Sequence, residues 1–452
     1  MTLSNIENSY HGPNKEKLGQ FFTYNLNVQK VMLRLVKNKK GLGLEPSAGD
    51  GILLKLLTGK FKKINFDAIE LDSSIPNISD QAIIYEDFFK WVSTNNKKYN
   101  LIFGNPPYVA QKNISPDSKL HMADLLERYT GKANLYQFFI HKAVDLLEEK
   151  GELIFIVPKE WLYSTSAKEL RSHLSNLGGF THLIDCGEEK LFTDADVPSI
   201  IIFRWEKGYK KEDLMFAKDL DSALNEKWVM SKLKSSNDRW SVLSEKLTKK
   251  TEKWGMLGDF YDVKVGLVTG YDKAFKIPKN NMLEESALQK QVDTSRKNAI
   301  FINVNHVNTE ADIPENTLKH LLLFKNELLS RRISKFDESN WWKYGAVRNS
   351  DLMSSKSKRF YSLVKTRSKN PFFNSNAKFF TGGVLGYFDK GRSDIPTKDA
   401  VRLLNSVEYR EILYSFFFIT NDKVSIQPST IADLPWPTSM LQLREFLDSS
   451  DT

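Results

Sequence analysis

The sequence of 452 residues contains a single cysteine and no long apolar run. Cys186 has no partner in the chain with which to form a disulfide, so a reducing cytoplasm is the expected compartment. No segment approaches the roughly 20 apolar residues of a membrane span. The N-terminal stretch, with Glu7 and His11, lacks the apolar core of a secretory signal. We therefore expect a cytoplasmic protein without a membrane anchor.

Signals for metals and repeats are also missing. The seven histidines are scattered without metal-ligand spacing, so no metal is expected. The sequence has no internal repeat, no low-complexity block and no convincing PD…ExK set of a restriction nuclease. These absences argue against a metal centre, a repeat architecture and a fused nuclease.

The composition is that of a globular protein, with 41% hydrophobic and 27% charged residues. The length exceeds that of one ordinary core, which predicts two domains. Up to Trp205 strand and helix patterns alternate, and after Gly208 this rhythm is lost. We predict an α/β domain over residues 1–208, a linker over 209–250 and a C-terminal α+β domain over 251–452.

The first domain is expected to hold a Rossmann-like, doubly wound sheet of seven strands. The strand-like segments are 42–45, 66–71, 83–85, 99–103, 152–157, 182–185 and 199–205. Helices are expected over 27–38, 136–149 and 168–177, and from residue 52 onward. In the C-terminal half, 258–270 and 381–387 have strand-and-turn patterns, and 400–417 is helical in pattern.

Positive charge is concentrated in one stretch of the C-terminal half. Between Lys325 and Lys378 there are thirteen Lys/Arg against four Asp/Glu, so this stretch alone has a net charge of +9, equal to that of the whole chain. Eight aromatic residues are interspersed with these charges. The composition suits a polyanion with stackable bases, but a solvated basic face over an aromatic core explains it equally well.

A ligand-binding turn is predicted where the first strand meets its helix, in the segment Glu45–Gly51 (EPSAGDG). Its glycines allow the backbone to approach a ligand, and its leading acid suits an ammonium group. Glu70 ends the second strand, where a carboxylate can accept from two ribose hydroxyls. Asp87 ends the third, where it could accept from an adenine amino group while Phe88 covers the ring. Each acid alone is more often a cap, but three at successive strand ends favour one shared ligand.

The fourth strand ends in Asn105-Pro106-Pro107-Tyr108. The lone pair of an exocyclic adenine nitrogen is delocalised into the ring, which makes this nitrogen a poor nucleophile. The side-chain carbonyl of Asn105 and the backbone carbonyl of Pro106 can accept its two hydrogens and localise that lone pair. The prolines restrict the loop and remove N–H donors, and Tyr108 can stack on the base. In other sequence contexts, the alternative interpretation of this tetrapeptide is an ordinary turn without a catalytic role.

These motifs resemble those of the gamma-class, TaqI-type N6-adenine DNA methyltransferases, over a region from about Lys17 to Trp205. Gly19–Thr23 (GQFFT) looks like the opening cofactor motif, and 134–139 resembles the helix behind the pocket. Leu191-Phe192 followed by Val197-Pro198-Ser199 resembles the segment whose phenylalanine, here Phe192, contacts the edge of the flipped adenine. The departures are Thr23-Tyr24, where the family usually has Thr-Pro, and an extended 111–132 loop.

The resemblance implies S-adenosylmethionine as cofactor, with no metal required, and double-stranded DNA as substrate. The implied cofactor-binding residues are Thr23, Glu45, Ser47, Gly49, Gly51, Glu70, Asp87, Phe88 and Asn105. The implied catalytic residues are Asn105, Pro106, Pro107, Tyr108 and Phe192. The target adenine would have to leave the duplex stack, and the C-terminal domain would recognise the target. Candidate DNA contacts are Arg331, Arg332, Arg348, Arg359 and Arg367.

Other assignments remain open at this point. Protein-glutamine methyltransferases share the tetrapeptide but carry their extra domain before the catalytic one, whereas here the extra residues follow Gly208 and are basic. An RNA adenine methyltransferase would be expected to have a smaller appendage. An inactive specificity subunit would not need an intact tetrapeptide and three acids. We expect a monomeric, site-specific DNA adenine methyltransferase that protects host DNA from a separate restriction endonuclease.

Overall fold

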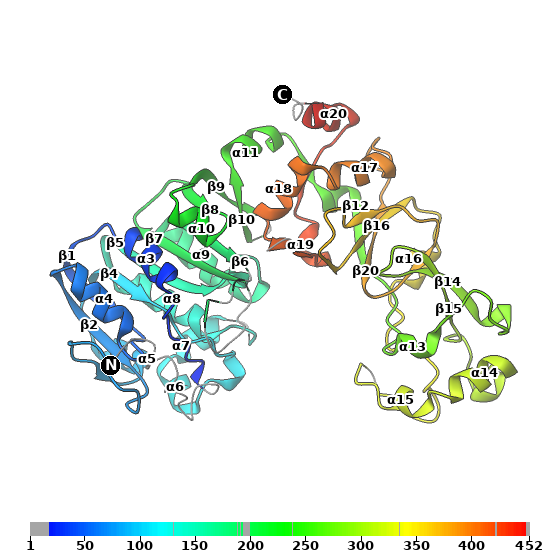
Figure 1. Ribbon diagram of the computed structural model, residues 1–452, viewed down its shortest axis with the longest axis horizontal. Helices are drawn as coiled ribbons and strands as arrows, with labels where there is room; N and C mark the ends of the chain where they lie inside the picture. Colours follow the sequence, from blue (N-terminus) through cyan, green and yellow to red (C-terminus); the bar gives the residue numbers. More distant parts are fainter. Residues whose placement is uncertain are drawn as a thin grey trace. The chain divides into compact units, whose positions relative to one another are not determined.

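A computed structural model describes residues 18–448, except 130, 188, 190, 193–198, 237, 334, 421 and 422. The chain divides into two compact units, Met1–Thr248 and Lys249–Thr452. Figure 1 shows the first unit in blue to green and the second in green to red. Each unit is described by itself below.

Within the described residues, the first unit is built on one ten-stranded sheet with the order β10-β9-β8-β6-β7-β5-β4-β1-β2-β3. The seven expected strands are all present and run as β1 to β7. Their bounds are β1 (Lys40–Glu45), β2 (Lys63–Glu70), β3 (Ile84–Tyr85), β4 (Tyr99–Gly104), β5 (Leu147–Pro158), β6 (Gly178–Gly187) and β7 (Ile200–Lys207). Strands β3, β2, β1, β4 and β5 are parallel neighbours, whereas β7 is antiparallel to both β5 and β6. The carboxyl ends of β1, β2 and β4 therefore share one edge of the sheet.

The expectation of a linker over 209–250 is wrong. This segment forms β8 (Asp213–Ala217), α10 (Leu220–Leu224), β9 (Val229–Ser236), β10 (Arg239–Ser244) and the start of α11 (Glu245–Thr251). Strand β8 pairs with β6, β9 pairs with β8, and β10 pairs with β9, so these three strands extend the sheet. The driving force is burial of alternating apolar side chains, among them Leu214, Phe216, Trp240 and Val242, beside many charged residues that face outward.

Helices accompany this sheet, and all of them except α5 were predicted from the apolar periodicity. They are α3 (Leu26–Leu35), α4 (Ile52–Lys60), α5 (Phe88–Thr94), α8 (Leu135–Leu146) and α9 (Lys168–Leu177). Helix α3 begins at Asn25, whose side chain accepts from the N–H groups of Asn27 and Val28, and it buries the predicted apolar face. The extended 111–132 loop folds into η1 (Gln111–Asn113), α6 (Pro116–His121) and α7 (Ala123–Arg128). Short 3-10 turns η2 (Lys159–Leu162) and η3 (Thr165–Ala167) follow β5.

The second unit has the expected α+β character. In its described part, the sheets have the orders β12-β20-β16-β18, β13-β15-β14-β19, β17-β22-β21 and β11-β23. The strands are β11 (Gly255–Met256), β12 (Tyr261–Val265), β13 (Lys276–Ile277), β14 (Leu288–Val292), β15 (Asn298–Ile302), β16 (Arg359–Leu363), β17 (Lys365–Thr366), β18 (Phe372–Phe373), β19 (Phe379–Phe380), β20 (Val384–Asp389), β21 (Ile419–Thr420), β22 (Lys423–Ser425) and β23 (Pro435–Trp436).

Short helices connect these strands. They are α12 (Leu257–Phe260), α13 (Asp272–Phe275), α14 (Glu315–Leu322), α15 (Lys325–Leu329), α16 (Ser350–Ser354), α17 (Thr397–Leu404), α18 (Val407–Ser415), α19 (Pro428–Ile431) and α20 (Met440–Asp448), with 3-10 turns η4 (Glu285–Ala287) and η5 (Glu310–Asp312). The helix expected over 400–417 is two helices, α17 and α18. They are separated because the side chain of Ser406 caps α18 by accepting from the N–H of Tyr409.

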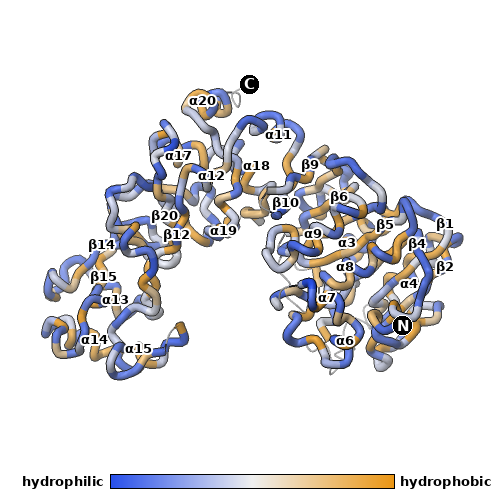
Figure 2. The backbone as a smooth tube through the Cα atoms, turned by 180° about the vertical axis from the view of Figure 1, so that it is seen from behind, coloured by the Kyte–Doolittle hydropathy of each residue, from blue (hydrophilic) through white to orange (hydrophobic). Residues whose placement is uncertain are grey.

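The aromatic residues of the basic stretch are mostly core residues. Six of the eight are buried, namely Trp341, Trp342, Tyr344, Phe360, Tyr361 and Phe372. The composition there reflects a basic surface over an aromatic core, so these rings are not surfaces on which nucleic-acid bases can stack. Figure 2 shows apolar and hydrophilic segments interspersed through both units. Among the described residues, no helix is long and apolar enough to cross a membrane.

Candidate active site

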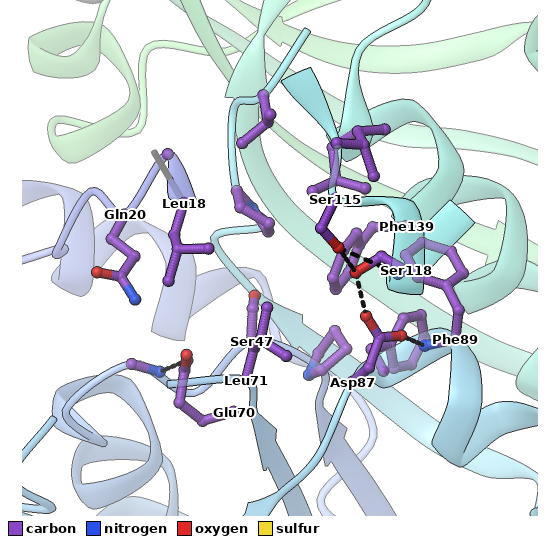
Figure 3. Close-up of a pocket in the computed structure, with 18 of the residues that line it drawn as sticks. Leu18, Gln20, Ser47, Glu70, Leu71, Asp87, Phe89, Ser115, Ser118 and Phe139 are labelled. Carbon is purple, nitrogen blue, oxygen red and sulfur yellow. Dashed lines mark hydrogen bonds between the residues drawn. The ribbon is translucent and has the colours of Figure 1, made fainter. Parts of the chain in front are cut away.

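A pocket opens in the first unit where β1, β2 and β4 end (Figure 3). Its walls come from residues 18–22, 46, 47, 49, 70, 71, 86–89, 105, 107, 109, 113–115 and 118, and from Leu135 and Phe139 of α8. Of the predicted site residues, Glu45, Pro106 and Tyr108 are not among those that line it. The predicted acidic and glycine turn, the ends of the next strands and the Asn-Pro-Pro-Tyr loop thus all meet at one cavity. The 111–132 segment, whose position the sequence does not predict, contributes part of the wall.

The turn after β1 needs its glycines. Gly49 and Gly51 have φ values of +56° and +82°, a region that other residues rarely adopt. A Cβ on Gly49 would lie 3.1 Å from the ring of Phe22, and one on Gly51 would lie 2.9 Å from Asn77 Oδ1. Between them, Asp50 accepts from the N–H of Ile52 at 3.0 Å and from the hydroxyl of Tyr24. Tyr24, one departure from the family pattern, therefore supports this turn.

Glu45, at the end of β1, is an isolated buried acid. Its side chain is 1% exposed, and its Oε2 has no hydrogen-bond partner among the described residues. Burial, followed by the charges of Asp50 and Glu70, raises the pKa of this carboxyl well above its usual range. A buried carboxyl without a partner is costly, so its position indicates a partner that the folded chain itself does not supply.

Glu70, at the end of β2, holds the turn from the other side. Its Oε2 accepts from the N–H of Gly49 at 2.8 Å, and its Oε1 accepts from the N–H of Asp72 at 2.9 Å. Burial raises the pKa of Glu70, while these two N–H groups act in the opposite direction. Each oxygen retains a lone pair that can face the pocket, where Glu70 lies beside Leu71 (Figure 3).

Asp87 is a helix cap, which is the alternative that the sequence left open for each of the three acids. It caps α5 by accepting from the N–H groups of Phe89 at 2.8 Å and Lys90 at 3.2 Å. Its other oxygen accepts from the hydroxyl of Ser118 in α6 at 2.6 Å, a contact visible in Figure 3. Phe88 is buried and stacks on Phe139 with ring centroids 4.8 Å apart. The acid and the aromatic pair form one end of the pocket, and Ser118 is a pocket residue that sequence reasoning missed.

The Asn-Pro-Pro-Tyr loop is held by a local hydrogen-bond network. The Asn105 amide donates to Phe21 O at 2.6 Å and to Thr23 Oγ1 at 3.2 Å, so the GQFFT segment is joined directly to it. The Asn105 side-chain oxygen accepts from the hydroxyl of Tyr108 at 2.7 Å, and its backbone oxygen accepts from Ser47 at 3.1 Å. The side-chain amide of Asn105 is therefore oriented by three hydrogen bonds, to Phe21, Thr23 and Tyr108.

Three aromatic rings gather beside this loop. Phe21 stacks on Tyr108 with centroids 5.1 Å apart, and Phe192 lies 5.6 Å from Phe21 and 6.1 Å from Tyr108. The structure thus places Phe192 beside Tyr108, although they are 84 positions apart. Phe21 was not singled out from the sequence, and its only signal was membership of the GQFFT motif. Val197 and Pro198 lie outside the described residues.

The five candidate arginines divide into two groups. Arg331 and Arg359 donate to backbone carbonyls, and their guanidinium groups lie over Phe336 and Phe388. Arg331 is only 8% exposed. Their donors already hold the fold together, so these two are the weaker candidates, and contact of any of the five with DNA remains a prediction. Arg332, Arg348 and Arg367 are exposed.

A histidine cluster on α8 and α9 was also missed. His141 and His173 stack with ring centroids 3.7 Å apart, and Asp145 bonds His173 at 2.8 Å. Together these three residues have the spacing to hold a metal ion, which the scattered sequence positions concealed. The four-residue spacing of His141 and Asp145 on one helix was the available signal. Both ring nitrogens of His141 already have protein neighbours, the hydroxyl of Tyr129 at 2.8 Å and Arg128 at 3.4 Å.

Comparison with known proteins finds similarity to methyltransferases of restriction–modification systems. Residues 23–192 match the family described as Eco57I restriction-modification methylase. The chain is 27% identical over 454 residues to the type II methyltransferase M.HindII of Haemophilus influenzae, covering 90% of this chain and 84% of that protein. It is 35% identical over 185 residues to the type II methyltransferase M.TthHB8I of Thermus thermophilus, covering 38% of this chain and 41% of that protein.

A solved structure extends the likeness in fold to most of the chain. The structure of the type IIL restriction-modification enzyme MmeI in complex with DNA superimposes with a TM-score of 0.56 at 11% identity, covering 90% of this chain and 64% of that one. The region that matches the family, residues 23–192, contains the glycine turn, the strand-end acids and the Asn-Pro-Pro-Tyr loop. The chain is therefore similar, over 90% of its length, to type II methyltransferases, and it shares the fold of a restriction–modification enzyme.

Proposed function

We propose that this chain transfers a methyl group from S-adenosylmethionine to the N6 amino group of an adenine in double-stranded DNA. One observation carries the proposal: the Asn105 loop opens onto the same pocket as Glu70 and Asp87. A group that can prepare an amino nitrogen for attack thus lies beside acids that suit the ammonium, ribose and adenine parts of the cofactor. The first unit would be the catalytic domain, and the second would recognise the target.

The residues present fit this cofactor. Glu45 has an unpartnered, buried oxygen that an ammonium group would satisfy, and the turn at Gly49 and Gly51 brings backbone close to it. Glu70 offers the remaining lone pairs of its two oxygens to ribose hydroxyls. Asp87 can accept from an adenine amino group, with Phe88 against the ring. Thr23 and Ser47 would hold the amino-acid end and the loop. When bound, the cofactor supplies the electrophilic methyl group.

At the target base, the protein would accept hydrogen bonds from the adenine amino group and fix the orientation of the adenine ring. Asn105 Oδ1 and the carbonyl of Pro106 would each accept one hydrogen of the adenine amino group, so that the nitrogen lone pair is free for in-line attack. Asn105 Oδ1 already accepts from the Tyr108 hydroxyl, which uses one of its two lone pairs and fixes its direction. Tyr108 would stack on the base and Phe192 would contact its edge. The methylated nitrogen then releases its extra proton to water, so the step requires no general base or metal.

The pocket can receive an adenine only after the base leaves the duplex, at a cost of a few kcal/mol. The second unit would hold that duplex through its basic surface, where the stretch from Lys325 to Lys378 has a net charge of +9. Arg332, Arg348 and Arg367 are the exposed candidates for these contacts. We further propose that the enzyme is a cytoplasmic monomer whose mark protects DNA from a separate restriction endonuclease.

The test is to express the chain in a host without adenine methylation and to map modified bases by single-molecule sequencing. N6-methyladenine in one short motif is expected. Modified cytosine, or an unmodified genome with soluble protein, would contradict the proposal. Asn105→Ala should abolish the mark while cofactor binding, measured by calorimetry, changes by less than about tenfold. Asn225→Ala is the matched control, because Asn225 is an exposed residue of the same unit that does not line the pocket, and it should retain the mark.

A further inference from the structure

Four exposed side chains of the second unit form two similar pairs, Arg332-Ile333 and Val347-Arg348. Ile333 is 49% exposed and Val347 is 46% exposed, and both arginines are exposed. These four residues are called the tip below. The first pair directly follows α15, which lies with α13 and α14 at one end of the second unit, away from α17 and α20 (Figure 1).

The two pairs are neighbours in space because two glycines allow it. Ile333 Cγ2 lies 3.1 Å from the point where a Cβ on Gly345 would be, and Ile333 Cδ1 lies 2.9 Å from the equivalent point on Gly270. The chain at Ala346 is in turn paired with Val268 through two backbone hydrogen bonds of 3.0 Å and 2.9 Å. The isoleucine therefore rests against the strand-like segment that ends in Val347 and Arg348.

Arg331 makes this arrangement rigid. Its guanidinium donates to the carbonyls of Leu328 at 2.7 Å, Lys343 at 2.9 Å and Trp341 at 2.6 Å, and also to that of Thr269. Its plane lies over the ring of Phe336, 3.7 Å from the centroid. One buried side chain thus joins three stretches of chain just beneath the tip, so the exposed residues are held in a preset geometry rather than on a free loop.

We propose that the tip enters a groove of the DNA and reads the target sequence, with Ile333 and Val347 against base edges and Arg332 and Arg348 beside them. This inference rests on the proposed function. Aliphatic side chains distinguish bases by contact with the thymine methyl group, and arginine binds the O6 and N7 of guanine or a phosphate. Val407, by contrast, is 73% exposed but lies between Ser406 and Glu408 and has no arginine next to it in the chain. The aromatic side chains of the basic stretch are mostly buried and so do not compete for the role.

The experiment compares methylation motifs of full-length variants in the host used above. Ile333→Ser with Val347→Ser, and Val347→Ser alone, should alter or relax one or two positions of the motif. Their kcat/KM on the wild-type site should fall by about 10- to 100-fold, while the salt dependence of DNA binding is retained. Arg332→Gln with Arg348→Gln should weaken DNA binding at least tenfold. Val407→Ser and Arg444→Gln, exposed residues of the same unit, are the matched controls and should leave motif and affinity unchanged.

The outcomes separate the two levels of inference. If the wild-type protein methylates one motif and the aliphatic variants methylate a changed motif, the result supports the tip as the part of the protein that reads the sequence. An unchanged motif and unchanged discrimination in folded aliphatic variants would overturn it while leaving the proposed function intact. A genome without N6-methyladenine under the wild-type protein would overturn both. Thermal unfolding of each variant establishes that it is folded.

Discussion

Replacing Glu45 by Gln tests the buried carboxyl at the end of β1, whose Oε2 has no hydrogen-bond partner among the described residues and which lies next to the pocket residue Pro46 in the chain. In the free protein the pKa of Glu45 is raised well above its usual range, by burial first and then by the charges of Asp50 and Glu70. The carboxyl is therefore protonated at pH values where an ordinary glutamate is charged. If it receives the ammonium of the cofactor, binding requires the carboxylate, so binding must release a proton. Glutamine keeps the shape but has no proton to release.

The size of the effect follows from the burial and the lost charge. A hydrogen bond to a charged group contributes about 1.5–3 kcal/mol, which predicts binding about 10- to 150-fold weaker in Glu45→Gln near neutral pH. Below the pKa of Glu45, the wild-type affinity should rise by up to about tenfold for each unit of pH, since one proton is linked to binding. The affinity of the variant should depend much less on pH.

Calorimetry with S-adenosylhomocysteine, which carries the same ammonium, measures both quantities at a series of pH values below about 7.7. In this range the ligand's own α-amino group, with a pKa near about 7.7–8.0, remains protonated. The observed heat in buffers of different ionisation enthalpy gives the number of protons released. Equal proton release by wild type and variant would refute this role of Glu45, because its titration would then not be linked to the ligand.

Three further substitutions test separate contacts. Ser118→Ala removes the hydroxyl that orients Asp87, and cofactor affinity measured by calorimetry should fall by about 2- to 12-fold; no change would mean that this contact does not orient the acid. Burial lowers the pKa of His141 to about 3, so the unfolded chain binds more protons as pH falls below about 6.5. Wild type should therefore lose about 1 kcal/mol more stability than His141→Gln between pH 7 and 5 in urea unfolding, after discounting for solvent; parallel losses would contradict this. Arg331→Met removes four hydrogen bonds to carbonyls and should destabilise the second unit by about 3 kcal/mol. Arg332→Met changes an exposed residue and should not destabilise it. Equal midpoints of thermal unfolding for the two variants would contradict this role of Arg331.

The seven strands of the first unit were predictable because buried strands are short, nearly continuous apolar runs. The pocket was predictable for a related reason: the ends of adjacent parallel strands necessarily share an edge, so Glu45, Glu70 and Asn105 had to lie near one another. The three strands after Gly208 were not, because β8 to β10 carry many charged residues and alternate, which resembles a solvated linker in one dimension.

Side-chain partnerships were the least predictable part. Arg331 and Arg332 are neighbours with the same charge, yet one is buried among carbonyls and the other is exposed. Ser118 meets Asp87 across 31 positions, and His141 meets His173 across 32. Composition and periodicity carry no record of such contacts, because they depend on how distant helices and strands pack.

The sequence by itself determined the local chemistry of this protein: the glycine turn whose φ values demand glycine, the Asn-Pro-Pro-Tyr loop whose prolines restrict its backbone, and the acids at strand ends. These are properties of a few consecutive residues, set by sterics and hydrogen-bonding capacity. Only the tertiary structure decided which charged groups are free to act. Packing leaves Glu45 without a partner and Arg332 exposed, and it uses Arg331 and Arg359 to satisfy carbonyls. The physical reason is that burial and pairing depend on the whole fold, whereas the identity of a side chain does not.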